Sequence, residues 1–249
     1  MQDHIEGTTM PVLVVELQQG EAVITEHGEL SWMSPSIAMA PQKGQGLMGR
    51  ISRAVAGGGF GVTRYEAANG PGTVAFAAKL PGRIFPVDLS TTGSVMVHRD
   101  GWLCGTPDVQ VSVGFQQNFG SGLFSGTGFM LEKLDGAGRA WLELSGEIIQ
   151  YDLQPGQQIL VHPGHVGAFT ASVNCSLSRI HGVSNILFGK DGFFLASLTG
   201  PGTVWLQTMS LPQLAGALAP YLPGNSAGGD ITAGAAGGVI VGLLSGRGI

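Results

Sequence analysis

Charged residues are scarce in this sequence, and basic residues are the scarcest of them. Asp, Glu, Lys and Arg together make up 12% of the 249 residues, about half the usual share of ~25%. Only 12 residues are Lys or Arg, against 17 acidic residues, so the formal net charge is −5. A protein that binds a nucleic-acid backbone needs a patch or stripe of basic side chains. We therefore expect no nucleic-acid partner.

Cysteine is almost absent, and the N-terminus lacks the apolar stretch of a secretory signal. The two cysteines, Cys104 and Cys175, do not form a Cys-x-x-Cys motif and are too few for a disulfide framework. The opening residues, MQDHIEGTTMPV, are acidic and resemble neither a signal peptide nor a transit peptide. We therefore expect a cytoplasmic protein, with peripheral membrane association as the alternative.

Glycine, in contrast, is abundant. The chain has 42 glycines, about 17% of its residues, where roughly 7% is usual. Apolar residues make up 43%, which is enough to form a core. Turns that contain glycine separate short segments in which apolar and polar residues alternate, the pattern of half-buried antiparallel strands. We therefore predict an all-β fold.

Two landmarks recur at a spacing of ~65 residues, which indicates an internal repeat. The first is an acidic residue and a leucine followed by two strands, in VELQQGEAVITEHGELSWM (15–33), VDLSTTGSVMVHRDGWLCG (87–105) and YDLQPGQQILVHPGHVGAF (151–169). The second is a Gly-x-Gly turn between strands. One such unit cannot bury its apolar face alone. We predict three tandem antiparallel β units around a pseudo-threefold axis, similar to a β-sandwich or a double-stranded β-helix.

The Gly-x-Gly turns end at equivalent positions of the three units, at Gly72, Gly138 and Gly202, which are 66 and 64 residues apart. We expect these glycines to be structural turn residues with positive φ, a conformation in which a Cβ atom costs ~1 kcal/mol or more. Replacement by valine is then expected to destabilise each turn by a similar amount.

The landmarks place the units at 10–78, 79–144 and 145–209. A connector at 44–59 in the first unit predicts a short helix, because Leu47, Ile51 and Val55 follow one another at helical spacing. A second short helix is predicted at 210–224.

The segment at 210–224 has Ser210 as a candidate N-cap and Pro212 in the first turn. The Gly/Ala-rich tail at 225–249 follows it. Four tail glycines recur at every fourth residue and would lie on one helix face, where they permit close packing of tails or association of 231–246 with a membrane surface. They are Gly234, Gly238, Gly242 and Gly246. A flexible, low-complexity terminus is the alternative.

Four segments carry a family resemblance: GPGTVAFAAKLPGRIFPVDL, GTGFMLEKLDGAG, LTGPGTVWLQT and VELQQGEAVITEHGELSWM. The chain resembles, over roughly residues 10–222, the altered-inheritance-of-mitochondria family, also described as similar to the tryptophan RNA-binding attenuation protein. The resemblance implies a compact all-β protein of three similar units, assembled as a homotrimer. Eukaryotic relatives are mitochondrial and linked to inner-membrane organisation, whereas this chain resembles a bacterial member. The RNA-binding label reflects fold similarity, and the acidic charge argues against that activity here.

One position of the repeat is a candidate metal site. Glu26, His98 and His162 occupy equivalent positions, and two imidazoles with a carboxylate suit Zn²⁺ or Fe²⁺. The three would converge only near the pseudo-threefold axis. Each is also the last strand residue before a turn, where polar residues are expected in any case. We favour the turn interpretation and expect no cofactor.

No motif for enzymatic catalysis stands out. The sequence has no Gly-x-Ser-x-Gly nucleophile motif and no phosphate-binding Gly-Lys-Ser/Thr. We therefore predict a non-enzymatic, homo-oligomeric β scaffold or binding module. Two alternatives stay open: a small-molecule or metal-binding protein with its site on the pseudo-threefold axis, and a membrane-associated organiser that acts through the tail.

Overall fold

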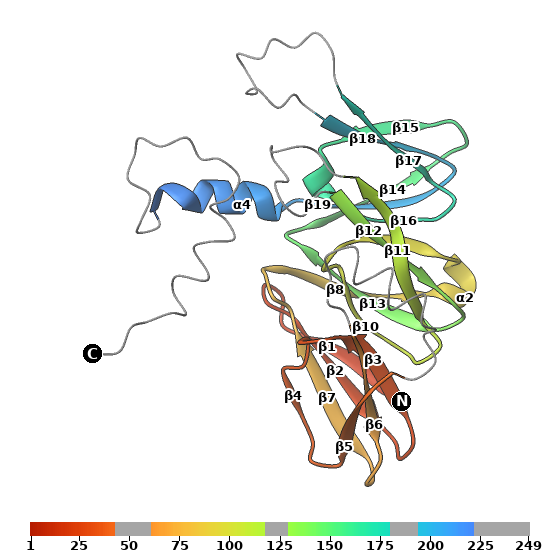
Figure 1. Ribbon diagram of the computed structural model, residues 1–249, viewed down its shortest axis with the longest axis vertical. Coiled ribbons are helices and arrows are strands. Elements are labelled where there is room, and N and C mark those ends of the chain that lie inside the picture. The colour runs from red at the N-terminus through yellow and green to blue at the C-terminus, as the bar shows by residue number, and fades with distance from the viewer. Residues whose placement is uncertain (43–60, 118–128, 180–193, 222–249) are drawn as a thin grey trace.

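A computed structural model of the protein describes residues 1–42, 61–117, 129–179 and 194–221 (Figure 1). The described residues form mostly antiparallel strands, with two short α-helices and two 3-10 turns among them. The all-β prediction is therefore confirmed. The predicted connector helix at 44–59 and the Gly/Ala-rich tail at 225–249 lie outside the described residues.

The strands form four sheets that follow one another along the long axis of the molecule (Figure 1). The first sheet, from edge to edge, contains β1 (Gln2–Glu6), β2 (Val12–Leu17), β7 (Gly72–Ala77) and β4 (Trp32–Met33). The second contains β5 (Ile37–Pro41), β6 (Val62–Ala67), β3 (Ala22–Glu26), β10 (Trp102–Gly105), β13 (Arg139–Ser145) and β8 (Gly82–Asp88).

The third and fourth sheets hold the remaining strands. The third contains β11 (Gln110–Gln117), β12 (Phe129–Asp135), β9 (Val95–His98), β16 (Val166–Thr170), β19 (Gly202–Gln207) and β14 (Ile148–Leu153). The fourth contains β15 (Gln158–Val161), β18 (Phe194–Thr199) and β17 (Asn174–Arg179). Every recorded pair of neighbours is antiparallel, as the alternation in the sequence predicts.

The second and third sheets have related strand orders. Adding six to each strand number of the second sheet gives the order of the third. Each sheet is two groups of three strands that join through one central pair, β3 with β10 and β9 with β16. Among the described strands β4 and β15 do not pair with each other. The four sheets therefore form an open series, and the predicted pseudo-threefold closure is not seen within the described part of one chain.

Both faces of the central sheets are buried, because neighbouring residues of a strand point to opposite faces. Val23 of β3 and Trp141 of β13 belong to a first core, with side chains of the first and second sheets. The residues next to them, Ile24 and Leu142, belong to a second core, which β9 and β12 of the third sheet also form. A third core lies between the third and fourth sheets and includes Phe169. Single strands therefore contribute to two cores.

The Gly-x-Gly turns differ in part from the sequence prediction. Gly202 has a φ of 143°, as expected, but in the other two turns it is the first glycine that has positive φ, Gly70 at 112° and Gly136 at 109°. The expectation of positive φ at Gly72 and Gly138 was wrong. Those two glycines are needed for space, because a Cβ atom would collide with a side-chain hydroxyl, that of Ser36 at Gly72 and that of Thr106 at Gly138.

Helices are few among the described residues, and they lie at chain turns. α2 (Leu89–Thr92) begins at Asp88, whose side chain accepts a hydrogen bond of 2.9 Å from the Ser90 N–H. α4 (Leu211–Leu218) continues into the 3-10 turn η2 (Ala219–Tyr221), so the short helix predicted at 210–224 is confirmed for its described part. Ser210 takes the N-cap position of α4, although its side chain makes no capping bond there.

Candidate functional site

Four glutamate side chains are buried close to the joint between β3 and β10. Glu26 ends β3, Glu29 follows in the turn, Glu132 lies on β12 and Glu143 on β13. A buried carboxyl group is costly unless it is protonated, paired or hydrogen-bonded. This cluster therefore stands out from the otherwise apolar interior, and each member needs a physical account.

Glu26 and Glu132 are neighbouring buried carboxyl groups, and each affects the pKa of the other. Burial raises the pKa of Glu132, and the neighbouring Glu26 carboxylate raises it further, to about 9. Burial also raises the pKa of Glu26, while the hydrogen bond with Glu132 opposes this rise. Two carboxyl groups this close cannot both ionise easily, so one holds the proton and donates it to the other. We assign the proton to Glu132 at neutral pH.

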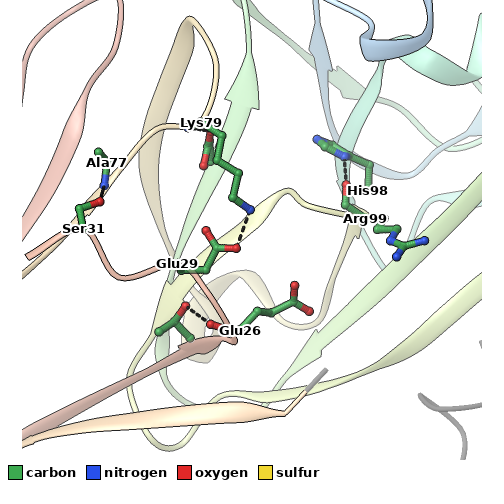
Figure 2. Close-up of polar contacts among 9 residues, drawn as sticks. Glu26, Glu29, Ser31, Ala77, Lys79, His98 and Arg99 are labelled. Carbon is green, nitrogen blue, oxygen red and sulfur yellow. Dashed lines mark hydrogen bonds and ion pairs between the residues drawn. The ribbon is translucent and has the colours of Figure 1, made fainter. Parts of the chain in front are cut away.

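Lys79 contacts the other two glutamates. Its ammonium group lies 2.5 Å from Glu29 Oε1 (Figure 2). Its backbone N–H donates to Glu143 Oε1 at 2.7 Å. Burial raises the pKa of both carboxyl groups, and these contacts partly offset the rise. Lys79 follows β7, so it brings the end of the first sheet against the second. The lysine therefore links three segments that are distant in sequence.

His98 lies close to the same cluster, at the end of β9. Its Nδ1 contacts the carbonyl oxygen of Arg99, so Nδ1 carries the hydrogen and donates it (Figure 2). Burial lowers the pKa of His98 and favours the neutral ring. Its Nε2, like one carboxyl oxygen of Glu143, is buried without a hydrogen-bond partner among the described residues. The Gln207 side chain lies close enough to raise the pKa of His98, but neither atom has a partner within hydrogen-bonding distance in the described part of the chain, so both are open to a polar ligand.

A cavity of about 270 Å³ adjoins these groups. Seven residues line it: Lys79, Leu80, His98, Asp100, Glu143, Ser145 and Leu211. A second cavity of about 150 Å³ shares four of them and reaches Gln207 of β19. The lining offers one ammonium, two carboxyl groups and an imidazole, which can hold a small polar molecule by hydrogen bonds.

The structure does not assemble the candidate metal ligands. Glu26 pairs with Glu132, and His98 donates to the Arg99 carbonyl oxygen. His162 starts the 3-10 turn η1 (Pro163–His165), where its Nδ1 accepts from the Gly164 N–H at 3.3 Å. Within the described ranges, no group of three or more His, Cys, Asp or Glu side chains could hold a metal ion.

Most of this cluster was not predicted from the sequence. Only Glu26 and the nearby His98 were candidates, as metal ligands, and no role was predicted for Glu29, Lys79, Glu132 and Glu143. A signal existed for two of them, since FMLEKLD (129–135) and AWLELS (140–145) place glutamate in otherwise apolar strands. A charged residue within an apolar strand is unusual, because ionised side chains are rarely buried unpaired.

The longest described helix is α4, with 8 residues, and none in the described part is long and apolar enough to span a bilayer. The tail glycines at 234, 238, 242 and 246 and the segment 231–246 lie outside the described residues.

The fold and the site together define an all-β protein of stacked sandwiches, with a buried carboxyl cluster at one joint. The family described as "Mitochondrial biogenesis AIM24" matches residues 4–209, and the chain therefore belongs to this family. An uncharacterised protein of Streptococcus pyogenes serotype M6 is 24% identical over 223 residues, which cover 87% of this chain and 88% of that protein. The family resemblance inferred from the sequence is thus confirmed.

A solved structure shares the fold. The crystal structure of a Streptococcus pyogenes protein superimposes with a TM-score of 0.71 at 21% identity, covering 89% of this chain and 99% of that one. At this identity the likeness concerns the fold and carries no activity.

Proposed function

We propose that this protein is a non-enzymatic, homo-oligomeric β scaffold, a homotrimer in which each chain is built from three repeated β units. The observation that carries the proposal is the shift of six between the strand orders of the second and third sheets. A repeated joint between units is typical of proteins that build a surface by stacking.

The registers of the two joints support the repeat. Ile24 of β3 faces Gly105 of β10, and Met96 of β9 faces Phe169 of β16. Gly105 also pairs with Ala140, and Phe169 pairs with Val204. Ala140 and Val204 each lie two residues after the second glycine of a Gly-x-Gly turn. The two joints therefore use equivalent residues, although the sequences differ.

Sheet edges support oligomerisation. β4 and β15 end their sheets, and each has one neighbour among the described strands. An exposed strand edge is a template for pairing with another chain, and soluble proteins cover or protect such edges. The scaffold proposal is tested by light scattering of the purified full chain at micromolar concentration. A mass three times that of one chain is expected, and a stable monomer would refute it.

A second candidate function is the binding of a small polar molecule in the cavity of about 270 Å³. The unpartnered oxygen of Glu143 and Nε2 of His98 favour it, because buried polar groups are normally satisfied. The two lining carboxyl groups favour a cationic ligand. Ethanolamine and acetate are matched probes for thermal shift measurements. We expect stabilisation by ethanolamine, no effect of acetate, and loss of the ethanolamine effect in Glu143→Gln.

A further inference from the structure

The first and fourth sheets, at the two ends of the series, expose positions that are buried at the internal joints. The repeat gives equivalent positions to Ile24 of β3, Met96 of β9 and Leu160 of β15. Each lies two residues before the position held by Glu26, His98 or His162. Ile24 is fully buried and Met96 is partly buried, but Leu160 is 58% exposed. The difference follows from the neighbours, since β3 pairs with β10 and β9 with β16, whereas β15 has β18 alone in the described sheet.

The same contrast holds on the opposite side of the joint. Equivalent positions are occupied by Trp32 of β4, Cys104 of β10 and Ala168 of β16. Each pairs with the residue that lies three positions after the second glycine of a Gly-x-Gly turn. Cys104 and Ala168 are fully buried, and each belongs to the core of the preceding sandwich. Trp32 is 53% exposed, because β4 is an edge strand with β7 as its one neighbour among the described strands. A tryptophan this exposed on an edge strand is a candidate contact residue.

A third position supports the pattern. The first landmark contains an equivalent leucine in each unit. The residues two positions before that leucine are Val15, Val87 and Tyr151. Val15 and Val87 are buried, whereas Tyr151 is 43% exposed. Ile149, on the same side of β14, is 44% exposed. Tyr151 and Ile149 therefore lack, among the described strands, a neighbouring sheet half that would cover them. Trp32 lacks one in the same way at the other end of the series of sheets.

Neither edge strand carries the usual protection against pairing. Residues 31–34 read SWMS and residues 158–161 read QILV, without a charge or a proline. Edge strands of soluble proteins commonly carry lysine, proline or a bulge to prevent association. The two edges cannot meet within one chain, because the second and third sheets separate them along the long axis (Figure 1).

We infer that β4 of one copy of this chain pairs antiparallel with β15 of a second copy and continues the internal joint from chain to chain. The register of the two internal joints then places Met33 opposite Leu160 and Trp32 opposite Val161. Trp32 covers the third core of the other copy, as Cys104 and Ala168 cover the first and second cores in the chain.

This joint is heterologous, since it uses different surfaces on the two copies. Such a contact either closes into a ring or propagates as a filament. Closure after three chains gives the homotrimer, so the inference rests on the proposed scaffold function and specifies its interface. All three described cores would then be covered in the same way.

Cysteine crosslinking tests the register. Two differently tagged full-length chains are co-expressed in a Cys175→Ser background, one with Met33→Cys and the other with Leu160→Cys. Residues directly opposite on antiparallel strands have Cβ atoms ~4.5–5.5 Å apart, within reach of a disulfide or a short bismaleimide. We expect a covalent species that carries both tags. The matched control is Met39→Cys with Leu160→Cys, because Met39 is 50% exposed on the edge strand β5, outside the joint.

Charge substitution provides a second measurement. Leu160→Asp is expected to convert the oligomer into monomers with an unchanged circular dichroism spectrum, and Met39→Asp is expected to leave the oligomer intact. An oligomeric wild type that shows no mixed-tag product and survives Leu160→Asp overturns this interface and leaves the scaffold proposal standing. Preferred crosslinking of Met33→Cys with itself also overturns it. A monomeric wild type overturns the scaffold proposal itself.

Discussion

The carboxyl groups of Glu26 and Glu132 are buried as neighbours, and each affects the pKa of the other, although their strands, β3 and β12, are more than a hundred residues apart in sequence. The pair costs stability at neutral pH. The unfolded Glu132 ionises near its ordinary pKa of 4.5, whereas the folded residue keeps its proton up to about pH 9. The unfolded state thus binds fewer protons between these values, and the stability falls as the pH rises through this window.

Glu132→Gln tests this relation. Glutamine replaces the protonated carboxyl group by a neutral amide that donates to Glu26 in the same way. At pH 8 we expect the variant to be more stable than the wild type, by about 2–4 °C in Tm for each kcal/mol regained. At pH 4.5 the two should melt together. Differential scanning calorimetry across pH 4.5–9 measures the difference, and an equal gain at both ends would contradict the assignment.

Lys79 and Glu29 should respond unequally to substitution. The Lys79 side chain is 47% exposed, so it reaches water when Glu29→Gln removes its partner, and we expect a loss of ~1 kcal/mol or less. Lys79→Met instead leaves Glu29 buried without its cation, for which ~1–3 kcal/mol is expected. Urea denaturation at pH 7 measures both. Similar losses for the two variants would show that the carboxyl group is less confined than the structure indicates.

Gly138→Val should destabilise the protein by ~1–3 kcal/mol, because the new side chain would overlap Thr106 and Val109. Gly216→Ala is a matched control, since nothing lies within 4 Å of a Cβ atom at this helical position. Alanine stabilises an exposed helix by up to ~1 kcal/mol relative to glycine. Thermal melting monitored by circular dichroism separates the two effects, and a wild-type Tm for Gly138→Val would remove the steric explanation.

Trp141→Phe tests a contact that ties the N-terminal strand to the second sheet. The indole N–H donates to Asp3 Oδ2 at 3.2 Å, and the ring lies 5.1 Å from the Arg139 guanidinium, which itself pairs with Asp3 at 2.6 Å. Phenylalanine loses the donor and also leaves a void, because it is smaller than the fully buried indole. We expect a loss of ~2–4 kcal/mol in unfolding free energy, with a smaller loss in an Asp3→Asn background, where only the void remains in full. Equal losses in both backgrounds would show that the two groups are not coupled.

Local patterns in the sequence predicted the fold class and a short helix within 210–224, because alternation and capping residues act over a few positions. They did not predict how the units join. The pairing of Ile24 with Gly105 depends on strands that are distant in the chain, and neither residue carries a signal for it. The turn glycines illustrate the same limit, since Gly72 and Gly138 avoid a collision with side chains that are distant in sequence rather than a backbone strain.

The candidate site was harder to predict for the same reason. Glu26 and His98 are equivalent by repeat position, and this equivalence suggested convergence on an axis. The open series of sheets places them at successive joints instead, where each meets different neighbours. Lys79 carries no pattern at all, and only its position between Glu29 and Glu143 gives it a role.

The strand β3 contributes Val23 to one core and Ile24 to the next, and β13 does the same with Trp141 and Leu142. Unfolding of one sandwich therefore exposes the core of its neighbour to water. The free energy of unfolding cannot be divided among the sandwiches, because each shared strand is counted in two of them. The chain should lose its structure in one cooperative transition, and a fragment cut between β13 and β14 should lose more stability than its length alone predicts.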